Sequence, residues 1–145
     1  MGKKKRVKKK VSSSGKPLVS VCTPTYNRRI FIPSLIKCFQ SQTYPKEKME
    51  WIVIDDGEDK VEDLFQGIEC VKYFYYPTKM KLGRKRNLMH EKAKGDIIVY
   101  MDDDDFYPPE RVNHAVNRLR SSPRAKASGS SIMYIYFKDT KKIFQ

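Results

Sequence analysis

The sequence predicts an α/β fold in which a mostly parallel sheet is covered by helices on both faces. Short apolar runs, typical of strands that are buried on both faces, alternate with segments whose apolar residues recur at i, i+3, i+4 and i+7. Helices of this kind supply the long crossovers that parallel strands need. We expect the order β-α-β-α-β-α-β-α-β-β in one domain, because 145 residues suit a domain of ordinary size.

The first half of the chain supplies two strands, a helix and a short weak helix. An apolar run at residues 18–22 predicts the first strand, which we expect to end at Pro24. The next apolar repeat has the helical spacing, and Pro33 suits its first turn. Residues 51–54 predict the second strand, and residues 60–66 predict the short helix.

The second half repeats the alternation and ends in a hairpin. Pro77 stops the third strand, and Gly95 ends the helix that follows it. Residues 138–141 have the composition of a turn. The predicted elements are a strand at 71–76, a helix at about 84–94, a strand at 97–101, a helix that opens at 108–109, and two hairpin strands at 130–137 and 142–145.

Charge is distributed unevenly, although the formal net charge of the chain is +13. Residues 1–16 are rich in lysine and contain no acid, so we expect a disordered basic tail ahead of a domain at 17–145. Cys22, Cys38 and Cys70 lack metal-binding spacing, and as reduced core thiols they favour a cytoplasmic location. We expect no secretory signal and no transmembrane segment, because no apolar run approaches about 18 residues.

Polar side chains follow three of the predicted strands. The first strand leads into residues 24–29, the second into 55–57, and the fourth into four aspartates at 102–105. Ligands of open parallel sheets bind beyond the carboxyl ends of the strands. If the first, second and fourth strands are neighbours, these three loops converge on one crevice.

The four aspartates at 102–105 predict a metal site. At a separation of about 4 Å and an effective dielectric of about 20, two carboxylates repel each other by about 4 kcal/mol, which a divalent cation offsets. Oxygen ligands without histidine or cysteine favour Mg²⁺ or Mn²⁺, and Mg²⁺ takes few carboxylates together with substrate phosphates. The alternative is a solvated acidic turn. The position directly after a buried strand favours the metal site.

The remaining polar residues each have a functional and a purely structural interpretation. Of Asp55 and Asp56, we expect one carboxylate to bind a ligand N–H or hydroxyl and the other to hold the loop, although both residues are also common in turns. Tyr26 is either a half-buried aromatic or a platform for a base. Arg84 and Arg86 begin a helix, where anions bind, but they also suit a solvated basic face.

Together these motifs resemble the nucleotide-sugar-binding half of the family 2 glycosyltransferases. The resemblance rests on residues 19–28, 51–57, 83–87 and 95–105 in that order, and it covers roughly residues 17–120. It implies the GT-A fold, a Rossmann-like α/β/α arrangement of three layers. It also implies a metal-dependent hexosyltransferase that takes a nucleotide-diphosphate sugar, usually linked to UDP, and glycosylates an acceptor that the sequence does not identify.

The resemblance also implies roles for individual residues. Asp56 corresponds to the acid that reads the ring N–H of the base, and Arg86 to a residue near the diphosphate. In the acidic DXD motif, Asp104 corresponds to the ligand of Mn²⁺ or Mg²⁺, and Asp102 supports the ribose or the metal's waters. The implied nucleotide-sugar site consists of Pro24, Thr25, Tyr26, Asn27, Asp56, Arg86, Asp102 and Asp103.

The sequence offers no general base for the transfer. In the family this base is an acid in the acceptor half, whereas the only acid after Glu110 is Asp139, in a predicted turn. We therefore expect a domain that is incomplete at its C-terminus, with the acceptor half missing. The alternatives are a reduced domain that binds the donor without transferring it, and a partner that supplies the remaining residues.

Two other function classes compete with this hypothesis. The lysine-rich residues 3–10 are typical of a nucleic-acid-binding tail, a nuclear localisation signal or a patch that binds an anionic membrane, and they are also consistent with a merely solvated tail. A nucleotidyltransferase can use a similar sheet and acidic metal site. It usually carries a glycine-rich phosphate loop after the first strand, and residues 24–27 contain no glycine.

Overall fold

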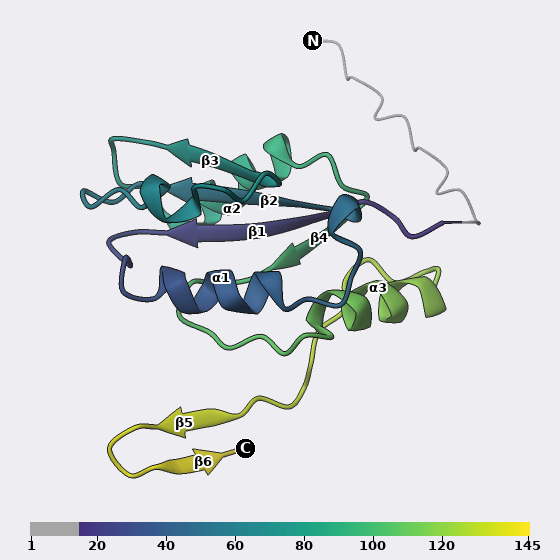
Figure 1. Ribbon diagram of the computed structural model, residues 1–145. Coiled ribbons are helices and arrows are strands. Elements are labelled where there is room, and N and C mark those ends of the chain that lie inside the picture. The colour runs from purple at the N-terminus through teal and green to yellow at the C-terminus, as the bar shows by residue number, and fades with distance from the viewer. Residues whose placement is uncertain (1–14) are drawn as a thin grey trace.

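A computed structural model describes residues 15–145 and shows a parallel four-stranded sheet (Figure 1). The spatial order of its strands is β3-β2-β1-β4, and every neighbouring pair is parallel. This arrangement confirms the α/β class and the mostly parallel sheet. Most of the expected basic tail lies outside the described residues. The strands of the sheet are β1 (Val19–Thr25), β2 (Met49–Asp55), β3 (Val71–Tyr75) and β4 (Ile97–Tyr100).

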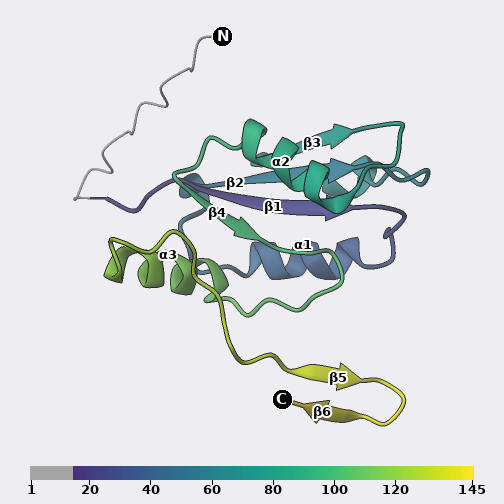
Figure 2. The same cartoon turned by 180° about the vertical axis from the view of Figure 1, so that it is seen from behind.

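Helices cover both faces of the sheet and complete three layers. Figure 1 shows α1 and α3 along one face, and the reverse view in Figure 2 brings α2 in front of β1 and β2. Within residues 15–145 no helix is both long and apolar enough to cross a membrane. The helices are α1 (Ile32–Gln40), α2 (Leu82–Lys92) and α3 (Arg111–Ser121), with short 3₁₀ turns η1 (Lys46–Lys48) and η2 (Glu62–Phe65).

The core is divided by the sheet because neighbouring residues of a strand point to opposite faces. Trp51 and Val53 of β2 pack on the side of α1 and α3, whereas Ile52 and Ile54 pack on the side of α2 with Met89. The larger cluster, which includes Trp51, also takes the apolar faces of α1 and α3. The near-continuous apolar strands are therefore explained by burial on both faces.

The first strand extends beyond its predicted end, and Pro24 lies inside β1 rather than after it. Pro24 is aligned with Ile54 of β2, while the pairing of β1 with β4 stops at Cys22. Beyond Cys22, β1 has no strand on its β4 side. A residue without a backbone N–H is tolerated at such a position, and β1 continues to Thr25.

The C-terminal hairpin is shorter than predicted and does not join the parallel sheet. Strand β5 (Ile135–Phe137) pairs antiparallel with β6 (Lys142–Phe144), and residues 138–141 form the predicted turn. The alternation that begins at Ser130 predicts a longer strand than β5, but residues 130–134 have no partner strand. The predicted helix at 60–66 is likewise reduced to the 3₁₀ turn η2.

Trp51 is the largest fully buried side chain and offers a direct test of the core. Its ring stacks on Phe39 at 4.2 Å between centroids and meets the edge of Phe65 at 5.2 Å, and its indole N–H donates to Thr23 Oγ1 at 2.9 Å. Trp51→Ala is expected to lower the free energy of unfolding by about 4 kcal/mol in urea denaturation. Ile30→Ala, at a side chain that is 81% exposed, serves as control and is expected to change it by less than about 0.5 kcal/mol. Equal effects of the two substitutions would contradict this core assignment.

Candidate functional site

The strand order brings the three polar strand ends together. Strand β1 lies between β2 and β4, and Thr25 at its end is aligned with Asp55 at the end of β2. On the other side, Thr23 Oγ1 donates to the carbonyl of Met101, directly after β4, at 2.7 Å. The convergence expected from the sequence is therefore present, and the loops after β1, β2 and β4 share one edge of the sheet.

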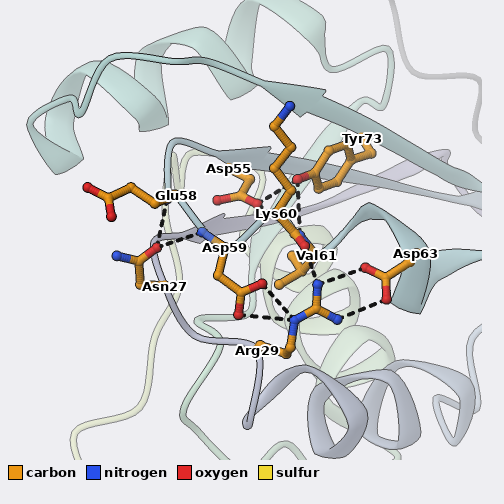
Figure 3. Close-up of polar contacts among 9 residues, drawn as sticks. All are labelled: Asn27, Arg29, Asp55, Glu58, Asp59, Lys60, Val61, Asp63 and Tyr73. Carbon is orange, nitrogen blue, oxygen red and sulfur yellow. Dashed lines mark hydrogen bonds and ion pairs between the residues drawn. The ribbon is translucent and has the colours of Figure 1, made fainter.

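Asp55 holds the loop that follows β2. Its carboxylate is fully buried and accepts a hydrogen bond from the N–H of Gly57 at 2.8 Å. It also accepts hydrogen bonds from the N–H of Val61 at 3.2 Å and the hydroxyl of Tyr73 at 2.5 Å (Figure 3). Burial, followed by the bond to Asp55, raises the pKa of the Tyr73 hydroxyl well above its ordinary value, which keeps it a donor. Of the two adjacent aspartates, Asp55 is thus the one that holds the loop.

Asn27 fastens the loop after β1 to the same segment. Its backbone has a positive φ of 52°, and its Oδ1 accepts from the N–H of Glu58 at 2.8 Å and of Asp59 at 3.2 Å (Figure 3). Gly57 permits this approach, because a Cβ at that position would lie 2.5 Å from the backbone nitrogen of Asn27. The side-chain oxygen of Asn27 is therefore committed to the loop, and a role in binding the nucleotide sugar stays a prediction.

Arg29 adds a second tie between these two loops. Its guanidinium donates to Asp59 Oδ1 at 2.8 Å, to both oxygens of Asp63 at 2.9 Å, and to the carbonyl of Lys60 (Figure 3). The hydrogen bonds that Arg29 donates to Asp63 and Asp59 raise the pKa of its guanidinium above the ordinary value. No motif indicated this residue, because its partners are 30 and more positions away in the sequence.

A buried ion pair joins α2 to the ends of β1 and β2. Lys85 forms an ion pair with Asp56, and its ammonium donates to the carbonyl of Thr25 at 2.7 Å. The exposed fraction is 6% for the Lys85 side chain and 0% for that of Asp56. Sequence reasoning missed Lys85 among the arginines of this helix. The available signal was its position four residues before Met89, on the buried face of α2.

The segment at residues 77–81 lies over the predicted base-binding residues. The ammonium of Lys79 stands 4.0 Å from the centroid of the Tyr26 ring. The backbone N–H of Met80 donates to Asp56 Oδ2 at 2.5 Å. One face of Tyr26 and one oxygen of Asp56 are thus occupied by the same short segment of this chain.

The acidic turn after β4 is partly neutralised by arginines. Arg86 lies 3.5 Å from Asp102, and Arg28 lies 3.5 Å from Asp104, in pairs whose side chains are more than a third exposed. Such exposed pairs stabilise a fold only weakly. Asp103 differs from its neighbours because it is buried, and burial raises the pKa of its carboxyl.

Tyr107 holds this acidic turn through two hydrogen bonds of its hydroxyl. Its hydroxyl accepts from the backbone N–H of Asp102 at 2.6 Å and donates to Asp105 Oδ2 at 3.2 Å. Burial raises the pKa of the Tyr107 hydroxyl well above its ordinary value, so the group stays protonated and can donate. The main chain at the start of the aspartate run is therefore fixed by a neutral side chain.

Two buried side-chain atoms at this turn have no hydrogen-bond partner, namely Arg86 Nε and Asp102 Oδ1. Buried polar atoms are almost always paired, so an unpaired donor beside an unpaired acceptor marks a place where a polar ligand fits. Of the two arginines of α2, Arg86 contacts the acidic turn, whereas Arg84 is exposed.

The carboxylates fit a metal that arrives together with a ligand. Within residues 15–145 no three histidine, cysteine, aspartate or glutamate side chains gather into a preformed metal cage. Asp102 and Asp104 nevertheless offer hard oxygen donors on one turn. Mg²⁺ is commonly held by one or two carboxylates plus substrate phosphates, and this donor set matches that pattern.

Asp139 does not reach this edge of the sheet. It lies exposed in the turn between β5 and β6, a hairpin that pairs only with itself (Figure 1). That Asp139 is not the general base stays a prediction, and no residue is assigned that role.

The fold and the strand-end motifs agree with one protein family. Residues 20–143 match Glycosyl transferase family 2. The chain belongs to this family. A glycosyltransferase of Haemophilus influenzae is 34% identical over 106 residues, which are 70% of this chain and 42% of that protein. The poly(ribitol-phosphate) β-N-acetylglucosaminyltransferase TarS of Staphylococcus aureus is 26% identical over 106 residues, 66% of this chain and 18% of TarS.

Solved structures confirm the GT-A fold of this family 2 chain. A crystal structure of Staphylococcus aureus TarS in complex with UDP has a TM-score of 0.65 at 26% identity, over 71% of this chain and 32% of that one. The mannosyltransferase PcManGT of Pyrobaculum calidifontis, in complex with GDP-Man and Mn²⁺, has a TM-score of 0.63 at 22% identity. The match covers 80% of this chain and 36% of PcManGT. The chain thus spans less than half the length of each of these relatives.

Arg29→Ala tests the tie between the loops after β1 and β2. Loss of its bonds to Asp59, Asp63 and the carbonyl of Lys60 should loosen residues 58–63. Their amide hydrogen exchange is expected to accelerate by about tenfold, with little change in the free energy of global unfolding, because the Arg29 side chain is 36% exposed and its acidic partners are more exposed still.

Arg118→Ala, at an exposed position of α3, is the matched control and should leave exchange at 58–63 unchanged. Unchanged exchange in Arg29→Ala as well would show that Asn27 and Asp55 hold this segment without Arg29.

Proposed function

We propose that residues 17–145 form the donor-binding part of a glycosyltransferase that takes a nucleotide-diphosphate sugar, linked to UDP, together with Mn²⁺ or Mg²⁺. The observation that carries this proposal is the meeting of Arg86 with Asp102 at the shared strand edge, where each residue keeps a buried polar atom without a partner. The relative TarS, which was crystallised with UDP, supports the choice of nucleotide.

The acidic turn is the proposed metal and diphosphate end of the site. Asp104 would hold the divalent cation, and Asp102, with Asp103 behind it, would support the ribose or the metal's waters. A bound cation stabilises the negative charge that develops on the departing diphosphate. Arg86 supplies a second positive charge for the same anion, fixed in place beforehand by α2.

The other end of the proposed site takes the nucleoside. Pro24, Thr25 and Tyr26 border the base and ribose, with Asn27 at the turn behind them, and Asp56 accepts the ring N–H of the base. Lys79 and Met80 contact Tyr26 and Asp56, so the segment at 77–81 must shift before a base can stack on that face of Tyr26 or donate to Asp56 Oδ2.

Transfer to an acceptor is a proposal for the whole protein, because this chain spans only part of its relatives' length. The acceptor hydroxyl needs a general base, and the described residues offer none at the site. The anionic partner of the lysine-rich residues, the cytoplasmic location and the nucleic-acid-binding alternative remain hypotheses, and no contact among residues 15–145 favours that alternative.

Isothermal titration calorimetry with UDP tests this function. The chain is expected to bind UDP about tenfold more tightly with Mn²⁺ than without it, since Asp104 would hold the cation and the cation would offset the negative charge of the diphosphate. In Asp104→Ala this gain should disappear.

Asp139→Ala removes an exposed acid far from the strand ends and should retain the full gain. The proposal fails if wild-type protein does not bind UDP, or if Mn²⁺ helps Asp104→Ala as much as it helps wild type.

A further inference from the structure

The proposed metal and diphosphate chemistry gives the ion pair of Lys85 and Asp56 no function. Both charges are removed from water, which is costly, and removing one partner would leave the other charge buried and unpaired. The ammonium contacts two of the predicted nucleotide-binding residues, Asp56 by the ion pair and Thr25 through its carbonyl. It therefore stands among the residues of the proposed nucleoside end.

The pair presents a defined pattern of donors and acceptors. An ammonium has three N–H groups, and Lys85 donates one of them to the Thr25 carbonyl while its charge pairs with Asp56 Oδ1. The second oxygen of Asp56 accepts the backbone N–H of Met80 at 2.5 Å. A backbone N–H and the ring N–H of a base are both neutral, planar donors. Met80 thus occupies the position in which a base would donate.

We propose that Lys85 is a positioning residue that sets base selectivity, by holding Asp56 as an ionised acceptor. This inference rests on the proposed function. An ionised carboxylate only accepts hydrogen bonds, whereas its protonated form also donates. Uracil and guanine carry a ring N–H at their pairing edge, while cytosine and adenine carry a ring nitrogen lone pair there. The fixed carboxylate therefore attracts the ring N–H of uracil or guanine and repels the ring lone pair of cytosine or adenine.

Lys85 also determines where the acceptor points. Its bond to Thr25 ties the ammonium to β1, and its ion pair ties Asp56, at the end of β2, to the same point. On base binding, the ring N–H replaces the Met80 N–H at Asp56 Oδ2, and the segment at 77–81 withdraws. Asp56 then changes its donor without changing its own position or charge.

The test is the ratio of the dissociation constants of CDP and UDP, measured by calorimetry on the full chain at saturating Mn²⁺. Wild type is expected to prefer UDP by about tenfold or more, because a site built for a ring donor strongly rejects the analogue that lacks it. In Lys85→Met the ratio should fall to about threefold or less, while the affinity for inorganic pyrophosphate is unchanged. Lys85→Arg, which keeps the charge, should restore most of the preference.

Two outcomes overturn the inference while leaving the proposed function intact. One is a Lys85→Met protein that binds UDP, CDP and pyrophosphate more weakly by one common factor, which indicates a merely structural lysine. The other is a ratio in Lys85→Met that equals that of wild type. Lys85→Gln, which removes the charge but can still donate to the Thr25 carbonyl, replaces Lys85→Met if that variant does not fold.

A control variant and a purine comparison accompany this ratio. Lys37→Met, on the exposed side of α1, controls for the loss of one positive charge and should leave the ratio unchanged. If wild type prefers a purine, the same ratio is taken for ADP and GDP. Wild-type protein that binds none of the four nucleotides contradicts the proposed function itself, and the inference with it.

Discussion

The arrangement of the whole site depends on the buried contact between Lys85 and Asp56. Through it a single side chain of α2 holds the ends of β1 and β2, because the ammonium also bonds the Thr25 carbonyl. The next residue, Arg86, reaches the acidic turn after β4. Two consecutive basic residues of one helix thus connect all three strand ends, and they place positive charge at both ends of the proposed donor site.

Burial separates the aspartates of this edge into two kinds. Asp55 is enclosed by donors from its own loop and from Tyr73, so its charge stabilises a local shape. Asp102 and Asp104 meet only arginines at 3.5 Å and stay partly exposed. Carboxylates of the second kind can exchange a guanidinium for a cation at small cost, because exposed ion pairs are weak. Aspartate therefore stabilises the loop at the end of β2, whereas after β4 it is available to bind a ligand.

The sequence predicts the parallel sheet and the converging strand ends, because both follow from local patterns. Apolar runs reveal β1 to β4, and the polar motifs reveal which loops follow β1, β2 and β4. Lys85 and Arg29 escaped prediction since their importance lies in partners 29 or more positions away. Pro24 was expected to end a strand, and it continues one only because β4 stops pairing beside it. Such features depend on which strands become neighbours, and a local pattern does not contain that information.

The central claim is that one sheet edge binds the donor, with its nucleoside end at Lys85 and Asp56 and its diphosphate end at the acidic turn. NMR titration of the full chain with UDP and Mg²⁺ tests this claim most directly. The account predicts that the largest backbone shifts cluster at residues 24–27, 55–57, 77–86 and 101–105. Shifts concentrated elsewhere, for instance in the cavity of about 820 Å³ between β4 and α3, would contradict it.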